Sequence, residues 1–203
     1  MNRSRRSTGP VAHKGPIRSA LSRGFTLIEL LIVAIMLAIL AAIIVPQFSG
    51  TTDGAAEAAL RSDLAGMRSA IALYRQQHGA FPGEVASTGG TCTGGTAGSG
   101  GAESVAAINE QLGLYSNASG QTCTLPVGGN FPFGPYLGQV GLPDNAVTNS
   151  NTVVIIGAAA TTAGDLTMAG DGAGGGWKYD VTSGKLIAND TNPDQAGVRF
   201  DAY

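Results

Sequence analysis

The most strongly patterned part of the chain is an apolar segment near its beginning. Between Phe25 and Val45 only Thr26 and Glu29 are polar. A helix needs about 20 apolar residues to cross a bilayer, so this segment predicts a membrane-spanning helix. Glu29 is unusual there, because a carboxylate in hydrocarbon is costly unless it finds a partner. We therefore expect Glu29 to have a function.

Beyond this segment the pattern becomes that of an amphipathic helix. Apolar residues recur at spacings of three and four at Leu60, Leu64, Met67, Ile71 and Tyr74. They predict a stripe that packs on a folded domain. Gly79 and Pro82 predict that the helix ends after His78. A helix from Phe25 to His78 would be about 80 Å long at 1.5 Å per residue, too long for the core of a small globular protein.

Pro46 is the last residue of the membrane-spanning part, residues 25–46, and the amphipathic part, residues 47–78, follows it. Proline removes a backbone donor, so a kink or a local opening of the helix is expected there. Gly50 and Gly54 follow, and they make the first turns after Pro46 weak as well.

Arginines recur every seven residues along the amphipathic part, at Arg61, Arg68 and Arg75. Two interpretations are open: a row that faces solvent, and a row that contacts other subunits. Glu57 stands four residues before Arg61, an orientation that favours an ion pair along the helix.

The rest of the chain predicts a small sheet that follows a loop region. Residues 79–150 are rich in Gly, Ser, Thr and Asn, with one short helix expected from Glu103 to Leu112 and its apolar face at Val105, Ile108 and Leu112. In residues 151–203, Thr152 to Ile156 predicts a strand, and Trp177 to Asn189 predicts a hairpin that turns at Thr182 to Gly184. A sheet packed on the apolar stripe gives an α+β fold, with a long N-terminal helix on a small antiparallel sheet.

Charge divides the chain unequally. Residues 1–24 contain six basic residues and no acidic one, which leaves six basic residues against 14 acidic ones in the remainder. A basic stretch before a membrane span is expected to stay in the cytoplasm, with the following residues outside. The acidic remainder excludes nucleic acid as the main partner, because phosphate binding needs a basic surface.

The stretch Gly24-Phe25-Thr26-Leu27-Ile28-Glu29 resembles the processing site of type IV prepilins and type II secretion pseudopilins. The resemblance implies a type IV pilin-like fold and removal of residues 1–24 by a membrane-embedded prepilin peptidase. Cleavage would fall between Gly24 and Phe25, with methylation of the new amine on Phe25. Glu29 would then meet the amine of a neighbouring subunit and set the register of assembly. An ion pair within one chain and simple snorkelling are the alternatives for Glu29.

The same resemblance implies a structural subunit of a helical filament. An inner-membrane platform protein and an assembly ATPase would be further partners. Before assembly the chain would lie in the inner membrane with its N-terminus in the cytoplasm, and afterwards in a periplasmic or cell-surface filament. The stretch from Ala72 to Glu84 is similar to the helix end of major pseudopilins, yet pilus and pseudopilus both stay open. A membrane-anchored extracytoplasmic binding protein that does not polymerise is the alternative from another class.

Cys92 and Cys123 are the two cysteines of the chain. A disulfide is expected between them if the residues after the apolar segment lie outside the cytoplasm. It would close a loop of about 30 residues, and two unpaired thiols are the alternative.

One candidate metal site is present near the end of the chain. Asp190, Asn192 and Asp194 place oxygen atoms at alternate positions, as at the start of a calcium loop. Pro193 interrupts the pattern, Gln195 stands where a glycine is expected, and no glutamate closes the loop. Calcium is therefore the one cofactor considered, with a polar turn as the alternative.

No set of catalytic residues can be assembled from the sequence, so an enzyme is not expected. His13 lies in the basic stretch, which leaves His78 as the other histidine. His78 is interpreted as a residue of the helix end, where the helix dipole favours a cation.

Overall fold

The computed structural model describes residues 24–126, 129–157, 168–172 and 175–203, with the side chains of residues 45–52 left out of the description. The chain divides into two compact units, Met1–Pro46 and Gln47–Tyr203. Helix α1 (Leu27–His78) contributes to both of them.

In the first unit, α1 exposes its apolar residues. All residues from 24 to 44 are exposed, because no other part of this unit covers them in the described structure. The segment Leu27–Ile44 has a mean hydropathy of 3.1 and is long and apolar enough to cross a membrane. These properties agree with the membrane-spanning helix that the sequence predicts.

In the second unit, α1 buries the predicted apolar stripe. Leu60, Leu64, Met67, Ile71 and Tyr74 are each at most 3% exposed. The helix ends at His78, as expected, because Gly79 adopts a left-handed conformation with φ of 75°. The Gly79 N–H then donates to the Arg75 carbonyl at 2.9 Å, which satisfies one of the last carbonyls of the helix.

The main sheet has three strands in the order β3 (Val153–Ile156), β4 (Trp177–Asp180) and β5 (Leu186–Ala188). Strands β4 and β5 form the predicted antiparallel hairpin, with Tyr179 opposite Leu186. Strand β3 lies at the predicted place but runs parallel to β4, with Val153 opposite Trp177. A parallel pair needs a long connection to bring the chain back, and the segment between Ile156 and Trp177 supplies one. The α+β class is confirmed, with a mixed sheet.

The loop region contains the predicted short helix, α2 (Val105–Gly113). Ser104 caps it, because its side chain accepts from the Ala107 N–H at 3.1 Å. Ile108 and Leu112 are buried as expected, whereas Val105 is 36% exposed and Gln111 takes its place on the buried face. After α2, strands β1 (Tyr115–Ser116) and β2 (Thr122–Cys123) pair antiparallel. A short 3-10 helix, η2 (Phe200–Ala202), lies near the end of the chain.

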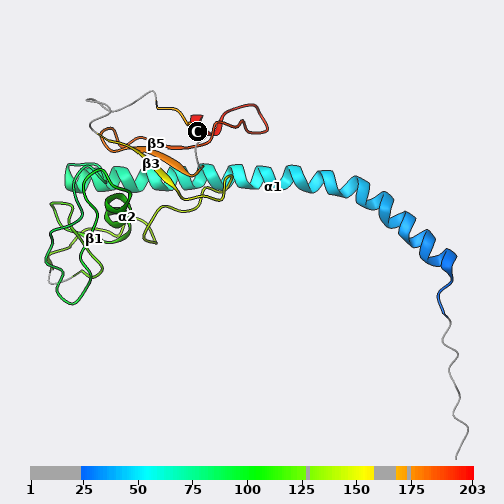
Figure 1. Cartoon of the computed structure of the whole chain (residues 1–203), viewed down its shortest axis with the longest axis horizontal. Coiled ribbons are helices and arrows are strands. Elements are labelled where there is room, and N and C mark those ends of the chain that lie inside the picture. The colour runs from blue at the N-terminus through cyan, green and yellow to red at the C-terminus, as the bar shows by residue number, and fades with distance from the viewer. Residues whose placement is uncertain (1–23, 127–128, 158–167, 173–174) are drawn as a thin grey trace, which may run out of the picture. The chain divides into compact units, whose positions relative to one another are not determined.

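One core joins these elements in the second unit. Side chains of β4 and β5, among them Trp177, Tyr179 and Leu186, pack with the stripe of α1 and with the buried face of α2. Figure 1 shows the sheet on one side of the C-terminal part of α1, and α2 with β1 on the other. The predicted packing of the sheet on the stripe is therefore confirmed.

Candidate processing and assembly site

The start of α1 is fixed by a reciprocal cap between Thr26 and Glu29. The Thr26 hydroxyl accepts from the Glu29 N–H at 3.3 Å, and the Glu29 carboxylate accepts from the Thr26 N–H at 3.4 Å. This is a capping box, in which a threonine and a glutamate three residues later satisfy each other's backbone donors. Gly24, Phe25 and Thr26 lie before the helix. The expected cleavage point between Gly24 and Phe25 is thus in non-helical, exposed backbone.

Gly24 has no steric reason to be a glycine in this structure. A Cβ atom built on it would meet nothing within 4 Å, and its φ is not in the left-handed region. Gly79, in contrast, needs its glycine to end α1. Cleavage after Gly24 stays a prediction.

The Glu29 carboxylate is available for a further partner. Its described contacts are all with Thr26, and they are 3.4–3.5 Å long on the carboxylate side. Hydrogen bonds of that length are weak, so exchanging them for a full positive charge would cost little. Phe25, whose amine would be released by cleavage, is the residue just before Thr26 and is 75% exposed.

Pro46 stands where the two units meet. Helix α1 continues through Pro46 and through Gly54 without interruption of its assigned helical structure. A kink at Pro46 stays a prediction, and the side chains around it lie outside the described residues.

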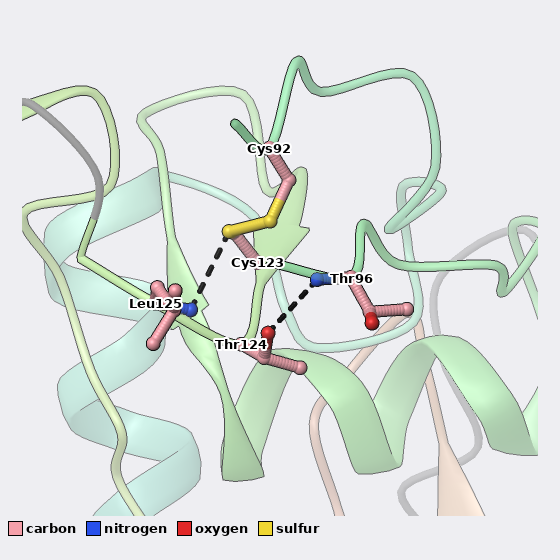
Figure 2. The surroundings of a disulfide bond; sticks show 5 residues. All are labelled: Cys92, Thr96, Cys123, Thr124 and Leu125. Atoms are coloured by element: carbon pink, nitrogen blue, oxygen red, sulfur yellow. Dashed lines mark hydrogen bonds between the residues drawn. A yellow bond between two sulfur atoms is a disulfide. The ribbon is translucent and has the colours of Figure 1, made fainter. Parts of the chain in front are cut away.

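The disulfide between Cys92 and Cys123 is present, with the Cα atoms 5.5 Å apart. Figure 2 shows how it ties the glycine-rich loop to β2 and to the turn that follows it. Two hydrogen bonds support the crosslink, from Thr96 N–H to the Thr124 hydroxyl at 2.9 Å and from Leu125 N–H to Cys123 Sγ at 3.4 Å. The glycine-rich loop is thereby joined to the β2 region at both Cys92 and Thr96.

The three residues considered for calcium are engaged by protein partners or by one another in this structure. Asp190 accepts from the backbone and side-chain N–H groups of Asn192 at 2.9 and 2.7 Å. The Asp194 carboxylate accepts from the Arg61 guanidinium at 3.2 Å and from the Tyr203 hydroxyl. Within the described parts of the chain, no three acidic, histidine or cysteine side chains gather in a way that could hold a metal. The donors around Asp194 already compensate its charge, so this set does not fit a hard cation.

The arginine row mostly holds the C-terminal segment in place. Arg61 donates to Asp194, and Arg68 donates to the Leu186 carbonyl at 2.8 Å and to the main-chain oxygen of Tyr203 at 2.7 Å. Neither interpretation from the sequence described these contacts. The predicted Glu57–Arg61 pair is not among the ion pairs of the described residues, because Glu57 accepts from the Gln195 N–H at 3.1 Å.

His78 is built into the helix end as a neutral ring. Its Nδ1 lies 3.1 Å from the Tyr74 carbonyl and its Nε2 lies 3.0 Å from the Ser116 hydroxyl. Because a carbonyl can only accept, Nδ1 carries the proton and Nε2 accepts from Ser116. Burial lowers the pKa of His78, which favours the neutral ring, and its place at the helix end is as expected. Ser116 is fully buried and cannot reach a substrate, so the pair is structural.

Comparison with known proteins identifies the segment around Gly24. The sequence profile of the prokaryotic N-terminal methylation motif matches residues 20–45. The N-terminal segment matches this methylation motif. It includes Gly24, Phe25 and Glu29, the residues on which the resemblance to prepilins and pseudopilins rests.

Curated relatives of two kinds share sequence with the chain. Type II secretion system core protein G of Klebsiella michiganensis is 33% identical over 66 residues, which cover 32% of this chain and 46% of that protein. Type IV narrow pilus major component PilA5 of Thermus thermophilus is 44% identical over 61 residues, which cover 30% of this chain and 53% of that protein. A fimbrial protein of Neisseria meningitidis is 41% identical over 73 residues, which cover 35% of this chain and 42% of that protein.

The chain thus spans about half the length of the curated relatives that it matches. No solved structure matches it significantly.

Sequence reasoning missed Thr26 as a partner of Glu29. The signal was present, because Thr-Leu-Ile-Glu at the start of an apolar run has the spacing of a capping box. It also missed Asp194 and Tyr203 as the partners of Arg61. Those contacts join residues more than a hundred positions apart, and no local pattern announces them.

Proposed function

We propose that this chain is a structural subunit of a type IV pilus-like or type II secretion pseudopilus filament. The observation that carries the proposal is a methylation motif at residues 20–45 on an exposed apolar helix that continues into a folded head. Residues 1–24 act as the cytoplasmic leader. A prepilin peptidase cuts after Gly24 and the amine of Phe25 is methylated.

The apolar half of α1 serves two successive environments. In the inner membrane it anchors the chain, with the unit Gln47–Tyr203 outside the cytoplasm. In the filament it packs against the same helix of other copies, with the heads on the outside. Lipid is already apolar, so this transfer gains little from the hydrophobic effect, and packing together with polar contacts must favour assembly.

Glu29 supplies the main polar contact of assembly. A carboxylate and an amine are each costly in an apolar filament centre, and pairing them offsets much of that cost. A single buried polar pair also sets register, because a shifted neighbour would leave both charges unpaired. An inner-membrane platform protein and an ATPase supply the energy that moves each subunit out of the membrane into the filament. Both are partners that we infer from the filament role.

The relatives named above include components of secretion systems and of pili, and we leave the choice between these two filaments open. A membrane-anchored binding protein that never polymerises is the second candidate. It is favoured only by the length and apolarity of Leu27–Ile44, which any single-span protein would share.

Replacing Glu29→Ala distinguishes the two candidates. A filament subunit is expected to lose assembly, with at least a tenfold drop in filaments seen by electron microscopy of sheared fractions. Membrane insertion of the variant should be unchanged, as checked by fractionation. A plain anchor would show no filaments with the natural sequence either, and that result would reject the proposal.

A further inference from the structure

A groove of about 400 Å³ runs along one flank of α1 in the unit Gln47–Tyr203. Its floor is apolar, formed by Leu64, Ala65 and Val198, and Val198 is 45% exposed. Arg61, Arg68 and Tyr203 complete the lining. The groove therefore combines an apolar floor with two guanidinium groups seven residues apart on the helix.

Both guanidinium groups retain unused donors. Among the described contacts, Arg61 donates through Nη2 and lies over the Tyr203 ring, 4.1 Å from its centroid, and Arg68 donates through Nε and Nη2 to main-chain oxygens. A guanidinium has five N–H donors, so Nη1 of each arginine remains for another partner. In the described part of the chain no aspartate or glutamate pairs with Arg68. The charge of Arg61 is compensated by Asp194, whereas Arg68 contacts only main-chain oxygens and can accept an acidic side chain as a further partner.

An acidic group without a partner lies on the other flank of the same helix. Residues of an α-helix are about 100° apart, which places Asp63 about 200° from Arg61 and Ala65 and about 140° from Arg68. Asp63 makes no hydrogen bond or ion pair in the described contacts and is only half-buried. Basic groove and unpaired acid therefore face away from each other in one copy.

This arrangement suits a contact between copies related by a repeated step. A helical filament needs two different, complementary patches on every subunit, because the patch used on one copy differs from the patch used on the next. The surface of α1 between the two flanks is exposed and built of small residues: Ala58, Ser62, Ala65, Gly66 and Ser69. Small side chains allow another helix to come close.

Resting on the filament function proposed above, we infer that the groove of Arg61, Leu64, Ala65, Arg68, Val198 and Tyr203 receives the Asp63 flank of a second copy. A shift of about 3–8 Å along α1 brings Asp63 of one copy level with the stretch from Ala65 to Arg68 of the next. Asp63 then pairs with the free donors of Arg68, and the small residues beside it cover the apolar floor.

Cysteine crosslinking in filaments of the full chain tests this contact. The variant carries Asp63→Cys together with Ala65→Cys, both on α1 and outside the native disulfide. The two positions point to opposite sides of the helix, so they cannot bridge within one chain. After mild oxidation, non-reducing gels are expected to show a ladder of crosslinked copies, with more than half of the chain above monomer.

The matched control pairs Asp63→Cys with Gln76→Cys, which is exposed and lies about 17 Å farther along α1 than Ala65. This pair is beyond the Cα separation of about 7 Å that a disulfide tolerates, so it should stay monomeric. Filaments that form normally but give no ladder with Asp63 and Ala65 would overturn the inference and leave the filament function intact. Absence of filaments from the natural sequence would instead reject the filament function.

Charge reversal gives a second measurement. Asp63→Arg is expected to lower the amount of filament at least fivefold, and Asp63→Asn to lower it less, because only the first adds repulsion to the groove. The melting temperature of the full chain in detergent should be unchanged in both, since Asp63 has no described partner within its own copy. Filament yields equal to that of the natural sequence in both variants would contradict the contact.

Discussion

At the scale of single residues, Glu29 has one observed contact and one proposed contact. In the described structure it caps α1 through Thr26, and in the proposed filament it pairs with an amine at Phe25 of another copy. The capping contacts on its carboxylate are long, so the charge remains available. This cap differs from the intrachain ion pair considered from the sequence, which stays untested, and assembly is proposed to use the same carboxylate.

Thr26 separates these two roles. Thr26→Ala removes the cap and should cost about 0.5–2 kcal/mol of helix stability while the Glu29 charge stays. Filament yield is expected to fall less than twofold, in contrast to the tenfold loss with Glu29→Ala. Thr26→Ser is the control, because serine caps equally well. A loss of filaments in Thr26→Ala as large as in Glu29→Ala would mean that capping, not charge pairing, explains Glu29.

His78 gives the head a pH dependence of known sign. Burial lowers its pKa below the ordinary 6.5, so the unfolded chain binds the proton more readily than the folded one. Stability is therefore expected to fall as the pH drops through about 6.5 toward the lowered value. The melting temperature of the full chain in detergent, measured between pH 7.5 and 5, checks this.

The carboxylates with lowered pKa values affect stability in a separate, more acidic pH range. Hydrogen bonds and the nearby guanidinium lower the pKa of Asp194, so its contribution to the stability of the fold is lost only below its ordinary pKa of 3.8.

The control for the His78 prediction is His78→Gln, which keeps a polar side chain and should make the melting temperature flat between pH 7.5 and 5. An unchanged slope in this variant would show that another group causes the dependence.

At the scale of elements, the loop around residues 87–100 is held by a disulfide and by a set of hydrogen bonds. The Cys92–Cys123 bond anchors it to β2, and Glu110 of α2 accepts from Ser87, from Ser99 and from the Gly100 N–H. Partial burial disfavours the charge of Glu110, yet these donors hold its pKa below the ordinary value. A glycine-rich segment without a core of its own is thereby given one conformation.

Removing the crosslink should destabilise this loop in particular. Cys92→Ser with Cys123→Ser opens a loop of about 30 residues, for which chain entropy predicts a loss of about 3–4 kcal/mol. Denaturant unfolding of the full chain in detergent measures the free energy. Proteolysis is expected to begin within residues 88–100, with α1 still intact. Equal stability with and without the crosslink would show that the Glu110 contacts suffice.

Elements with local signals were predictable from the sequence, and so was the disulfide, because the chain has only two cysteines, whereas the strand direction of β3 and the contacts of the arginines were not. The period of Leu60 to Tyr74 and the alternation around the Thr182–Gly184 turn each depend on neighbouring residues. The parallel pairing of β3 with β4 depends on how a long connection crosses the sheet. The binding of Arg68 to Leu186 depends on the packing of the finished core, so no local pattern predicted this contact, although Arg61, Arg68 and Arg75 are exposed, as a row that faces solvent requires.

At the scale of the whole molecule, the two units divide the proposed work. The unit Met1–Pro46 contains the matched methylation motif and the apolar part of α1. The unit Gln47–Tyr203 has its own core and disulfide. The methylation motif matched at residues 20–45 lies within the first unit.

The central claim is that the processed chain is the building block of a filament. Mass analysis of the N-terminal peptide of protein recovered from sheared filaments tests it most directly. The account predicts a peptide that begins at Phe25 and carries one methyl group on its amine. Filaments lacking this protein, or a chain that keeps Met1 and is found only in the membrane fraction, would contradict the account.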